Sequence, residues 1–254
     1  MLAIISALKN NSLIVGKAVE KTDMDDFSID DVFVKRAARK RDHEAEAIEE
    51  REAAIKQHKS MTRSLETCSS CFDSSEFKKH LLVAIGKTCY VTLPPYTSLT
   101  EDHCLIVPMG HDKCGTMLDE DVHNEMQSFR KELTSMFLNE DRDCIFFETA
   151  IGLKHHPHMV YHCVPLPRED GDSAPMFFQK AIQECETEWS HNKKLITLTQ
   201  EKDIRRSVPK GLPYFHVDFG LQNGFAHVIE EEQYFPKNFA QGNFNQNYDG
   251  ARIF

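Results

Sequence analysis

The chain has 254 residues, enough for one large domain or two small ones, and 41% of them are hydrophobic, which is sufficient for a buried core. The formal net charge of −10 argues against a general, non-specific nucleic-acid binder, because such affinity comes mostly from phosphate neutralisation, but it leaves room for a local basic patch. No run approaches the ~20 apolar residues of a membrane span, so no membrane partner is expected. The first fifteen residues also lack the cleavage pattern of a secretory signal.

Eight cysteines are scattered along the chain, unlike the dense spacing of a small disulfide-stabilised secreted protein. Several lie inside apolar runs, where a buried free thiol is expected. A reducing, intracellular compartment therefore fits this composition better. Only Cys68 and Cys71 have a spacing that needs a functional explanation.

The N-terminal region is predicted to be an extension, residues 1–66, that contains one long charged helix. Residues 1–22 show no pattern and are expected to be poorly ordered, whereas Val32 to Glu66 is rich in helix formers and contains no Gly or Pro. Its apolar stripe is weak, so the helix either extends from the globular body or docks onto a partner. Its basic block has two interpretations. The residues either form opposite-charge pairs on a solvated helix, or they contact phosphates or a protein partner. That block consists of Lys35, Arg36, Arg39, Lys40 and Arg41.

Residues 67–167 are predicted to form a first domain of short strands and one helix. Apolar residues from Asp119 to Leu138 recur at helical spacing, which predicts a helix packed on a sheet. Antiparallel strands covered by one long helix make an α+β fold. The expected strands are 80–85, 89–93, 103–107, 144–149 and 158–165.

A Pro-rich and acidic stretch after residue 164 marks a boundary, and residues 168–240 are predicted to form a second, smaller α+β module. Ala174 to Ser190 has a helical pattern. The strand-like runs Tyr214 to Phe219 and Gly224 to Ile229 are joined through a glycine-containing turn, which indicates a hairpin. The Asn/Gln/Gly-rich tail, residues 241–254, offers no core and is expected to be disordered.

The strand predicted at residues 158–165 carries alternate histidines. Because side chains alternate between the two faces of a strand, His158, Val160 and His162 should share one face. The expected strand therefore presents one imidazole on each side of a valine.

Cys68-x-x-Cys71 by itself is compatible with a zinc site, a redox pair or coincidence. His111 and His158 are available downstream, and two thiolates with two imidazoles satisfy tetrahedral zinc without an open position, as in structural sites. The competing interpretation is a reduced surface pair with unrelated histidines. Cys114, three residues beyond His111, is an alternative ligand.

The stretch from Glu101 to His111, EDHCLIVPMGH, followed by the alternate-histidine strand, resembles the histidine-triad superfamily. In zinc-bearing members the ligands fall, by position, on Cys68, Cys71, His111 and His158. Over residues 23–240, motifs that include CFDS, PHMVY, VPKGLPYFHVDFG and GFAHVIE resemble the CwfJ C-terminal family of Cwf19-like, splicing-associated proteins. This resemblance implies a histidine-triad-like domain followed by a second domain, whose end is expected to be truncated because the tail after Ala240 departs from the family pattern.

Catalytic histidine-triad proteins use the middle histidine as the nucleophile on an α-phosphate. The corresponding position here is Val160, which has no lone pair, so the ordinary superfamily reaction should be lost. His103, Val160 and His162 are assigned to a degenerate pocket, in which His162 could still donate a hydrogen bond. The alternative is a nucleotide hydrolase or nucleotidyl transferase in which His156 binds zinc and His158 is the nucleophile.

The resemblance implies a non-catalytic, nuclear factor of pre-mRNA splicing that acts in the late spliceosome or in intron-lariat turnover. Its implied partners are spliceosomal proteins, snRNA or intron RNA and the lariat-debranching machinery. A purely protein-binding scaffold is the third interpretation. Besides the basic block at residues 35–41, the candidate RNA or partner contacts are Lys202, Arg205, Arg206 and Lys210.

Overall fold

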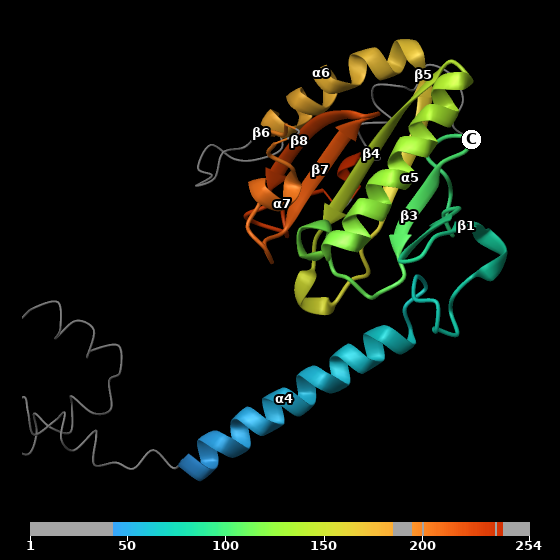
Figure 1. Ribbon diagram of the computed structural model, residues 1–254. Coiled ribbons are helices and arrows are strands. Elements are labelled where there is room, and N and C mark those ends of the chain that lie inside the picture. The colour runs from blue at the N-terminus through green and yellow to red at the C-terminus, as the bar shows by residue number, and fades with distance from the viewer. Residues whose placement is uncertain (1–42, 185–194, 200, 237, 241–254) are drawn as a thin grey trace, which may run out of the picture. The chain divides into compact units, whose positions relative to one another are not determined.

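The computed structural model describes residues 43–184, 195–199, 201–236 and 238–240 (Figure 1). The chain divides into two compact units, residues 1–58 and 59–254. The predicted lead-in at 1–22, the basic block at 35–41 and the tail at 241–254 all lie outside the described residues.

The predicted charged helix is present as α4, His43–Glu66, and the part predicted at residues 32–42 lies outside the described range. Residues 48–61 of α4 are all exposed, including Ile48, Ile55 and Met61. None of the helices in the described part of the chain combines the length and apolar character needed to cross a membrane.

The α+β prediction is confirmed by an eight-stranded antiparallel sheet with the strand order β1-β2-β3-β5-β4-β7-β8-β6 (Figure 1). The five strands expected before residue 168 are all present, although some of their ends differ. The strands are β1 Leu82–Ile85, β2 Cys89–Thr92, β3 Cys104–Pro108, β4 Arg142–Ala150, β5 Tyr161–Pro167, β6 Ile196–Thr197, β7 Tyr214–Phe219 and β8 Gln222–Val228.

The helices that accompany the sheet are α5 Glu120–Asn139, α6 Arg168–Glu184 and the short α7 Ile204–Ser207. Three single 3₁₀ turns lie in the connections: η1 Lys79–Leu81, η2 Gly115–Met117 and η3 Leu153–His155. The prediction for α5 differs by one residue at each end. Helix α6 begins six residues earlier than expected, with two acidic residues in its first turn that suit the positive end of the helix dipole.

Helices α5 and α6 cover opposite faces of the sheet, as the alternation of buried strand residues requires. On one face Met126 and Phe137 of α5 pack in a cluster with Phe146 of β4. On the other, Phe178 of α6 packs in a cluster with Phe147, the next residue of β4. The central strands are therefore buried on both sides, which holds the residues at their ends in fixed positions.

The strands that follow residue 168 continue the same sheet rather than forming a sheet of their own. Strand β7 pairs directly with β4 from Ile145↔Phe219 to Ala150↔Tyr214. The predicted hairpin is confirmed by the pairing of β7 with β8. The two-residue edge strand β6 was not anticipated, because two residues are too few to show a period.

The prediction that the last strand of the first domain begins at His158 is wrong, because β5 begins at Tyr161. The backbone N–H of Met159 donates to the carbonyl oxygen of Asp112 at 2.7 Å, so this segment pairs with the loop after β3. The side chain of His158 is correspondingly bonded to the Pro108 carbonyl and not aligned with His162. Only Val160 and His162 keep the expected alternation.

A carboxylate from α5 secures the turn between β1 and β2. Glu125 accepts hydrogen bonds from the backbone N–H groups of Lys87, Thr88 and Cys89 and from the Thr88 hydroxyl. A Cβ atom on Gly86 would lie 2.5 Å from a Glu125 carboxylate oxygen, so only glycine lets the carboxylate approach the turn. Burial by itself would raise the pKa of Glu125, but these hydrogen bonds lower it to about 2.

This depressed pKa predicts an acid-dependent loss of stability. The contribution of Glu125 is fully present above its ordinary pKa, near 4.5, and is lost as the pH falls towards 2. Glu125→Gln should therefore be less stable than wild type at pH 7, and the difference should shrink on acidification over that window. Urea unfolding at several pH values measures it, with Glu132→Gln as the control on the same helix; a difference that is independent of pH would contradict the assignment.

Candidate metal centre and histidine pocket

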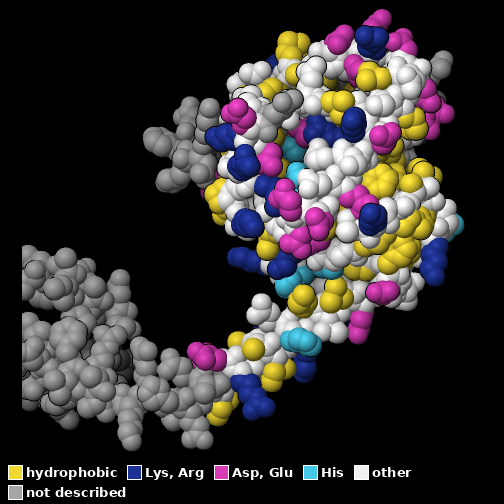
Figure 2. All heavy atoms as spheres, in the orientation of Figure 1, with side chains coloured by type: hydrophobic (Ala, Val, Ile, Leu, Met, Phe, Trp, Pro, Cys, Tyr) yellow, Lys and Arg dark blue, Asp and Glu magenta, His cyan; other side chains and the backbone are white. Residues whose placement is uncertain are grey.

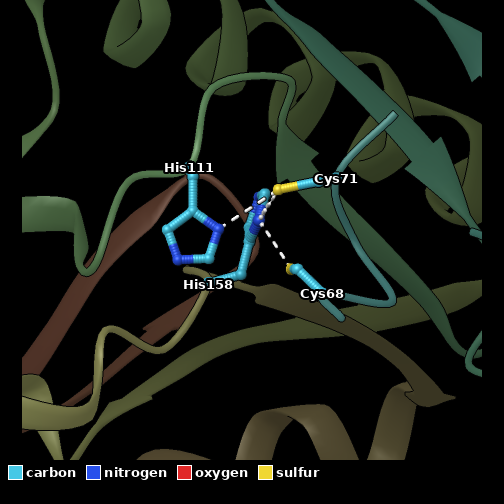
Figure 3. Close-up of side chains that lie close together, drawn as sticks. All are labelled: Cys68, Cys71, His111 and His158. Atoms are coloured by element: carbon cyan, nitrogen blue, oxygen red, sulfur yellow. Dashed lines mark hydrogen bonds between the residues drawn. The ribbon is translucent and has the colours of Figure 1, made fainter. Parts of the chain in front are cut away.

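Four side chains from three separate segments meet at one end of the sheet (Figure 3). Cys68 and Cys71 lie between α4 and η1, His111 follows β3, and His158 directly precedes β5. Their ligand atoms all lie within 4.8 Å of one another. Cys71 is buried and the other three are partly buried, so the cluster is shielded without being sealed.

The spacing of the four ligand atoms fits one small metal ion. Cys71 Sγ lies 3.1 Å from His111 Nδ1 and 3.4 Å from His158 Nδ1, and Cys68 Sγ lies 3.4 Å from the same His158 nitrogen. In a tetrahedral site with typical zinc–sulfur and zinc–nitrogen bonds, neighbouring ligand atoms are ~3.5 Å apart. The arrangement therefore matches a closed four-ligand centre.

Both imidazoles are oriented through their second nitrogen. His111 Nε2 donates to the carbonyl oxygen of His156 at 2.9 Å, and His158 Nε2 donates to that of Pro108 at 2.9 Å. Because a carbonyl oxygen only accepts, the proton of each neutral ring sits on Nε2 and the lone pair on Nδ1 faces the sulfurs. Metal-binding histidines are held in this way by backbone carbonyls.

The pKa values of His158 and Cys71 suit a cluster that binds a cation. Burial lowers the pKa of His158 to about 4, which keeps the imidazole neutral, as a metal ligand must be. Burial, followed by the neighbouring Cys68, raises the pKa of Cys71 to about 12. The Cys71 thiol therefore stays protonated at neutral pH unless a positive charge stabilises its thiolate. A metal ion held by the four residues would supply that charge.

The loop that carries the two cysteines is anchored on the sheet by aromatic residues. The Tyr90 hydroxyl donates to the carbonyl oxygen of Ser70, between the two cysteines, at 2.6 Å. Phe72 and Phe77 stack on one another at 4.7 Å, and each meets the Tyr90 ring edge-on. This packing places the cysteines opposite the loops that hold the histidines.

The two alternative ligands weighed from the sequence lie elsewhere. Cys114 is fully buried in a different apolar cluster, with its sulfur 3.3 Å from the Thr116 hydroxyl. His156 contributes its carbonyl oxygen to His111, and its ring is not a member of the four-residue cluster.

Two of the residues assigned from the sequence to a degenerate pocket, His103 and His162, form a hydrogen-bonded pair. The backbone N–H of Leu99 donates to His103 Nδ1 at 3.2 Å, so His103 carries its proton on Nε2 and donates it to His162 Nδ1 at 3.1 Å. The His162 ring also stacks on Phe147, with ring centroids 4.3 Å apart. Burial lowers the pKa of His103 to about 4 and that of His162 to about 3, so both rings are neutral at pH 7.

Val160 directly precedes β5 and packs against the apolar cluster that includes Leu105 and Val107; Leu105 is the cross-strand partner of His162. The position to which the resemblance in sequence assigned a nucleophile is therefore occupied by a hydrophobic side chain. His103 and His162 are a pair of neutral imidazoles, and the valine side chain has no lone pair with which to attack phosphorus.

The second basic cluster lies on and around α7, where Figure 2 shows Lys and Arg side chains gathered. Arg205 is ion-paired with Glu120 at 2.9 Å, and the Arg206 guanidinium donates to the carbonyl oxygen of Glu201. Lys202 and Lys210 are exposed. Two of the four predicted contacts are thus partly engaged within the protein.

The sequence did not reveal a buried polar network that joins α5 to β7. Asp218 accepts hydrogen bonds from Tyr161 at 2.9 Å and Gly224 at 2.9 Å and is ion-paired with Arg130 at 2.8 Å. His216 Nε2 lies 3.2 Å from the same carboxylate. The only signal available was the alternation His216-Val217-Asp218, which places two polar side chains on a face that should be buried.

The fold and the four-residue cluster together define an α+β protein with a Cys₂His₂ centre at one end of its sheet. Two family models match the chain, "Protein similar to CwfJ C-terminal" over residues 55–179 and "Protein similar to CwfJ C-terminus 2" over residues 188–244. The chain belongs to the CwfJ C-terminal family, which confirms the resemblance found in its motifs.

Among curated relatives, the chain is 54% identical to CWF19-like protein 2 of Mus musculus over 225 residues, which is 89% of this chain and 25% of that protein. CWF19-like protein 2 of Danio rerio is 49% identical over 91% of this chain and 24% of its own length. Pre-mRNA-splicing factor cwf19 of Schizosaccharomyces pombe is 32% identical over 69% of this chain and 28% of its own length. The chain thus spans about a quarter of the length of these relatives.

Proposed function

We propose that the chain is a non-catalytic, zinc-stabilised module of a nuclear pre-mRNA splicing factor that binds RNA or protein partners in the late spliceosome or during intron-lariat turnover. The splicing context is carried over from the names of its relatives. On this proposal the sheet is a histidine-triad-like scaffold, Cys68, Cys71, His111 and His158 hold zinc, and the lariat-debranching machinery is among the partners.

The proposal that the chain is not an enzyme is supported by the interactions of His158, because both of its ring nitrogens already have partners. Its Nδ1 faces two sulfurs and its Nε2 donates to the Pro108 carbonyl, so neither nitrogen offers a lone pair to a substrate. A nucleophilic histidine needs one nitrogen free for attack. This weighs against a nucleotide hydrolase or nucleotidyl transferase that uses His158.

The four ligands fit zinc because two thiolates and two imidazoles form the closed donor set of structural zinc centres. The ion would connect the cysteine loop, the loop after β3 and the segment before β5. Such a link would hold three loops at one end of the sheet in place of a large local core.

RNA binding through the α7 cluster is expected to depend on the two exposed lysines. The double variant Lys202→Glu/Lys210→Glu should weaken binding of a fluorescein-labelled 20-nucleotide single-stranded RNA, measured by anisotropy at several salt concentrations. The salt slope should fall in magnitude by ~0.7 for each phosphate that the protein no longer neutralises. Lys131→Glu/Lys180→Glu, which makes the same charge change at two exposed lysines on α5 and α6, is the control. Unchanged affinity and slope would exclude this RNA surface and favour a protein-binding scaffold.

A further inference from the structure

The sheet has a notch at the start of β4, beyond the end of β7. Strand β5 pairs with β4 from Arg142 onward, whereas β7 pairs with it only from Ile145, opposite Phe219. The first residues of β4 therefore have a neighbouring strand on one side only. A cavity of about 280 Å³ opens at this notch. The end of α5, the start of α6 and the β7–β8 turn surround it, in the upper part of Figure 1.

The lining of this notch is largely apolar, and the charged side chains among its described residues are two carboxylates. Leu138 at its rim is 48% exposed, and Leu221 is 54% exposed. Asp143 of β4 and Asp172 of α6 contribute the charge, and no Lys, Arg or His lines the cavity among the described residues. The lining consists of Thr134, Leu138, Asp143, Cys144, Ile145, Gly171, Asp172, Pro175, Phe219, Gly220, Leu221 and Gln222.

Neither carboxylate forms an ion pair with another residue in the described part of the chain. Arg168, the cation that lowers the pKa of Asp143, is ion-paired with Asp141 at 3.1 Å. Burial and then Asp172 raise the pKa of Asp143. A Cβ atom on Gly171 would lie 2.4 Å from that of Asp143, so helix α6 approaches the aspartate closely only because residue 171 is glycine. The fold thus holds two like charges together beside an apolar hollow.

We propose that this notch binds a lysine or arginine side chain of a partner peptide whose neighbouring residues are aliphatic. The carboxylates Asp143 and Asp172 provide charge complementarity for the cation. The exposed leucines Leu138 and Leu221 provide apolar surface at the rim of the notch, which a small free cation would leave uncovered. The volume lies just below the ~300 Å³ of the smallest ligand pockets, which suits one long side chain. The notch shares no residue with the metal centre.

The test compares the fluorescein-labelled peptides Leu-Arg-Leu and Leu-Glu-Leu, as terminal amides, by fluorescence anisotropy on the full chain. The arginine peptide should bind, and Asp172→Lys should weaken it at least ten-fold. Leu221→Ser should weaken it several-fold. Two controls lie on α6 outside the notch: Glu169→Lys matches the first change in charge reversal, and Met176→Ser, at a side chain 63% exposed, matches the second in replacing an apolar side chain by serine. Both should bind as wild type does.

Three results would overturn the proposal. Equal binding of the glutamate peptide would remove the charge selectivity, and binding of arginine amide as tight as that of the tripeptide would indicate a small-cation site. Self-association in sedimentation velocity that Asp172→Lys abolishes would assign the notch to a second copy of the chain. All four substituted side chains are exposed or line the surface of the cavity, so the variants should keep the wild-type fold.

Discussion

Replacing both Cys68 and Cys71 by serine should remove one zinc ion per chain and abolish cooperative unfolding. Structural zinc centres contribute an apparent ~10–16 kcal/mol in zinc-finger peptides, which is comparable with the ~5–15 kcal/mol total stability of a domain. Loss of both thiolates should therefore release the three loops that meet at the centre. Metal content by mass spectrometry, together with thermal unfolding of the same samples, measures both effects.

The matched control is Cys114→Ser, which changes a buried cysteine three residues after His111 but outside the cluster. This variant should keep its zinc. Freshly reduced wild-type protein without metal, or a double variant that retains it, would refute the zinc centre and leave His158 available for other chemistry.

Asp218→Ala should destabilise the protein by ~3–5 kcal/mol, because it leaves the Arg130 guanidinium buried without its ion-pair partner. The side chains of both residues are less than one-tenth exposed. The hydrogen bonds from Tyr161 and from the Gly224 backbone disappear with the same change. Urea unfolding of the zinc-loaded protein measures the difference in free energy.

Asp218→Asn serves as the graded comparison, since it keeps the size and one acceptor oxygen but loses the charge, and should fall between Asp218→Ala and wild type. Asp121→Ala, an exposed aspartate on α5, should be close to neutral. A destabilisation below ~1 kcal/mol for Asp218→Ala would mean that the buried arginine finds another partner.

Much of the fold was predictable because its signals are local. Helix α5 was identified from apolar residues at helical spacing, and β7 from a strand-like run between a proline and a glycine. The four metal-centre residues were selected because thiols and imidazoles are few and chemically distinctive. The structure brings those four together, as the prediction required.

The errors arose where distant backbone groups decide the conformation. Strand β5 begins at Tyr161 because the Met159 N–H pairs with Asp112, some fifty residues earlier in the chain. Likewise, β6 exists because its two residues pair with β8. Neither interaction leaves a period or a turn signal in the segment concerned.

Four properties follow from the amino-acid sequence without any structure: the α+β class, the family, the absence of a nucleophile at Val160 and the identity of the four candidate metal ligands. The α+β class depends on short-range periodicity and the choice of metal ligands on residue chemistry, whereas the family and the position of Val160 come from the resemblance of motifs to known families. The tertiary structure was needed to separate His158 from His162, to join Asp218 to Arg130 and to open the notch beside Asp143. Each of these depends on which strands become neighbours, and that is decided by the burial of both faces of one continuous sheet between α5 and α6.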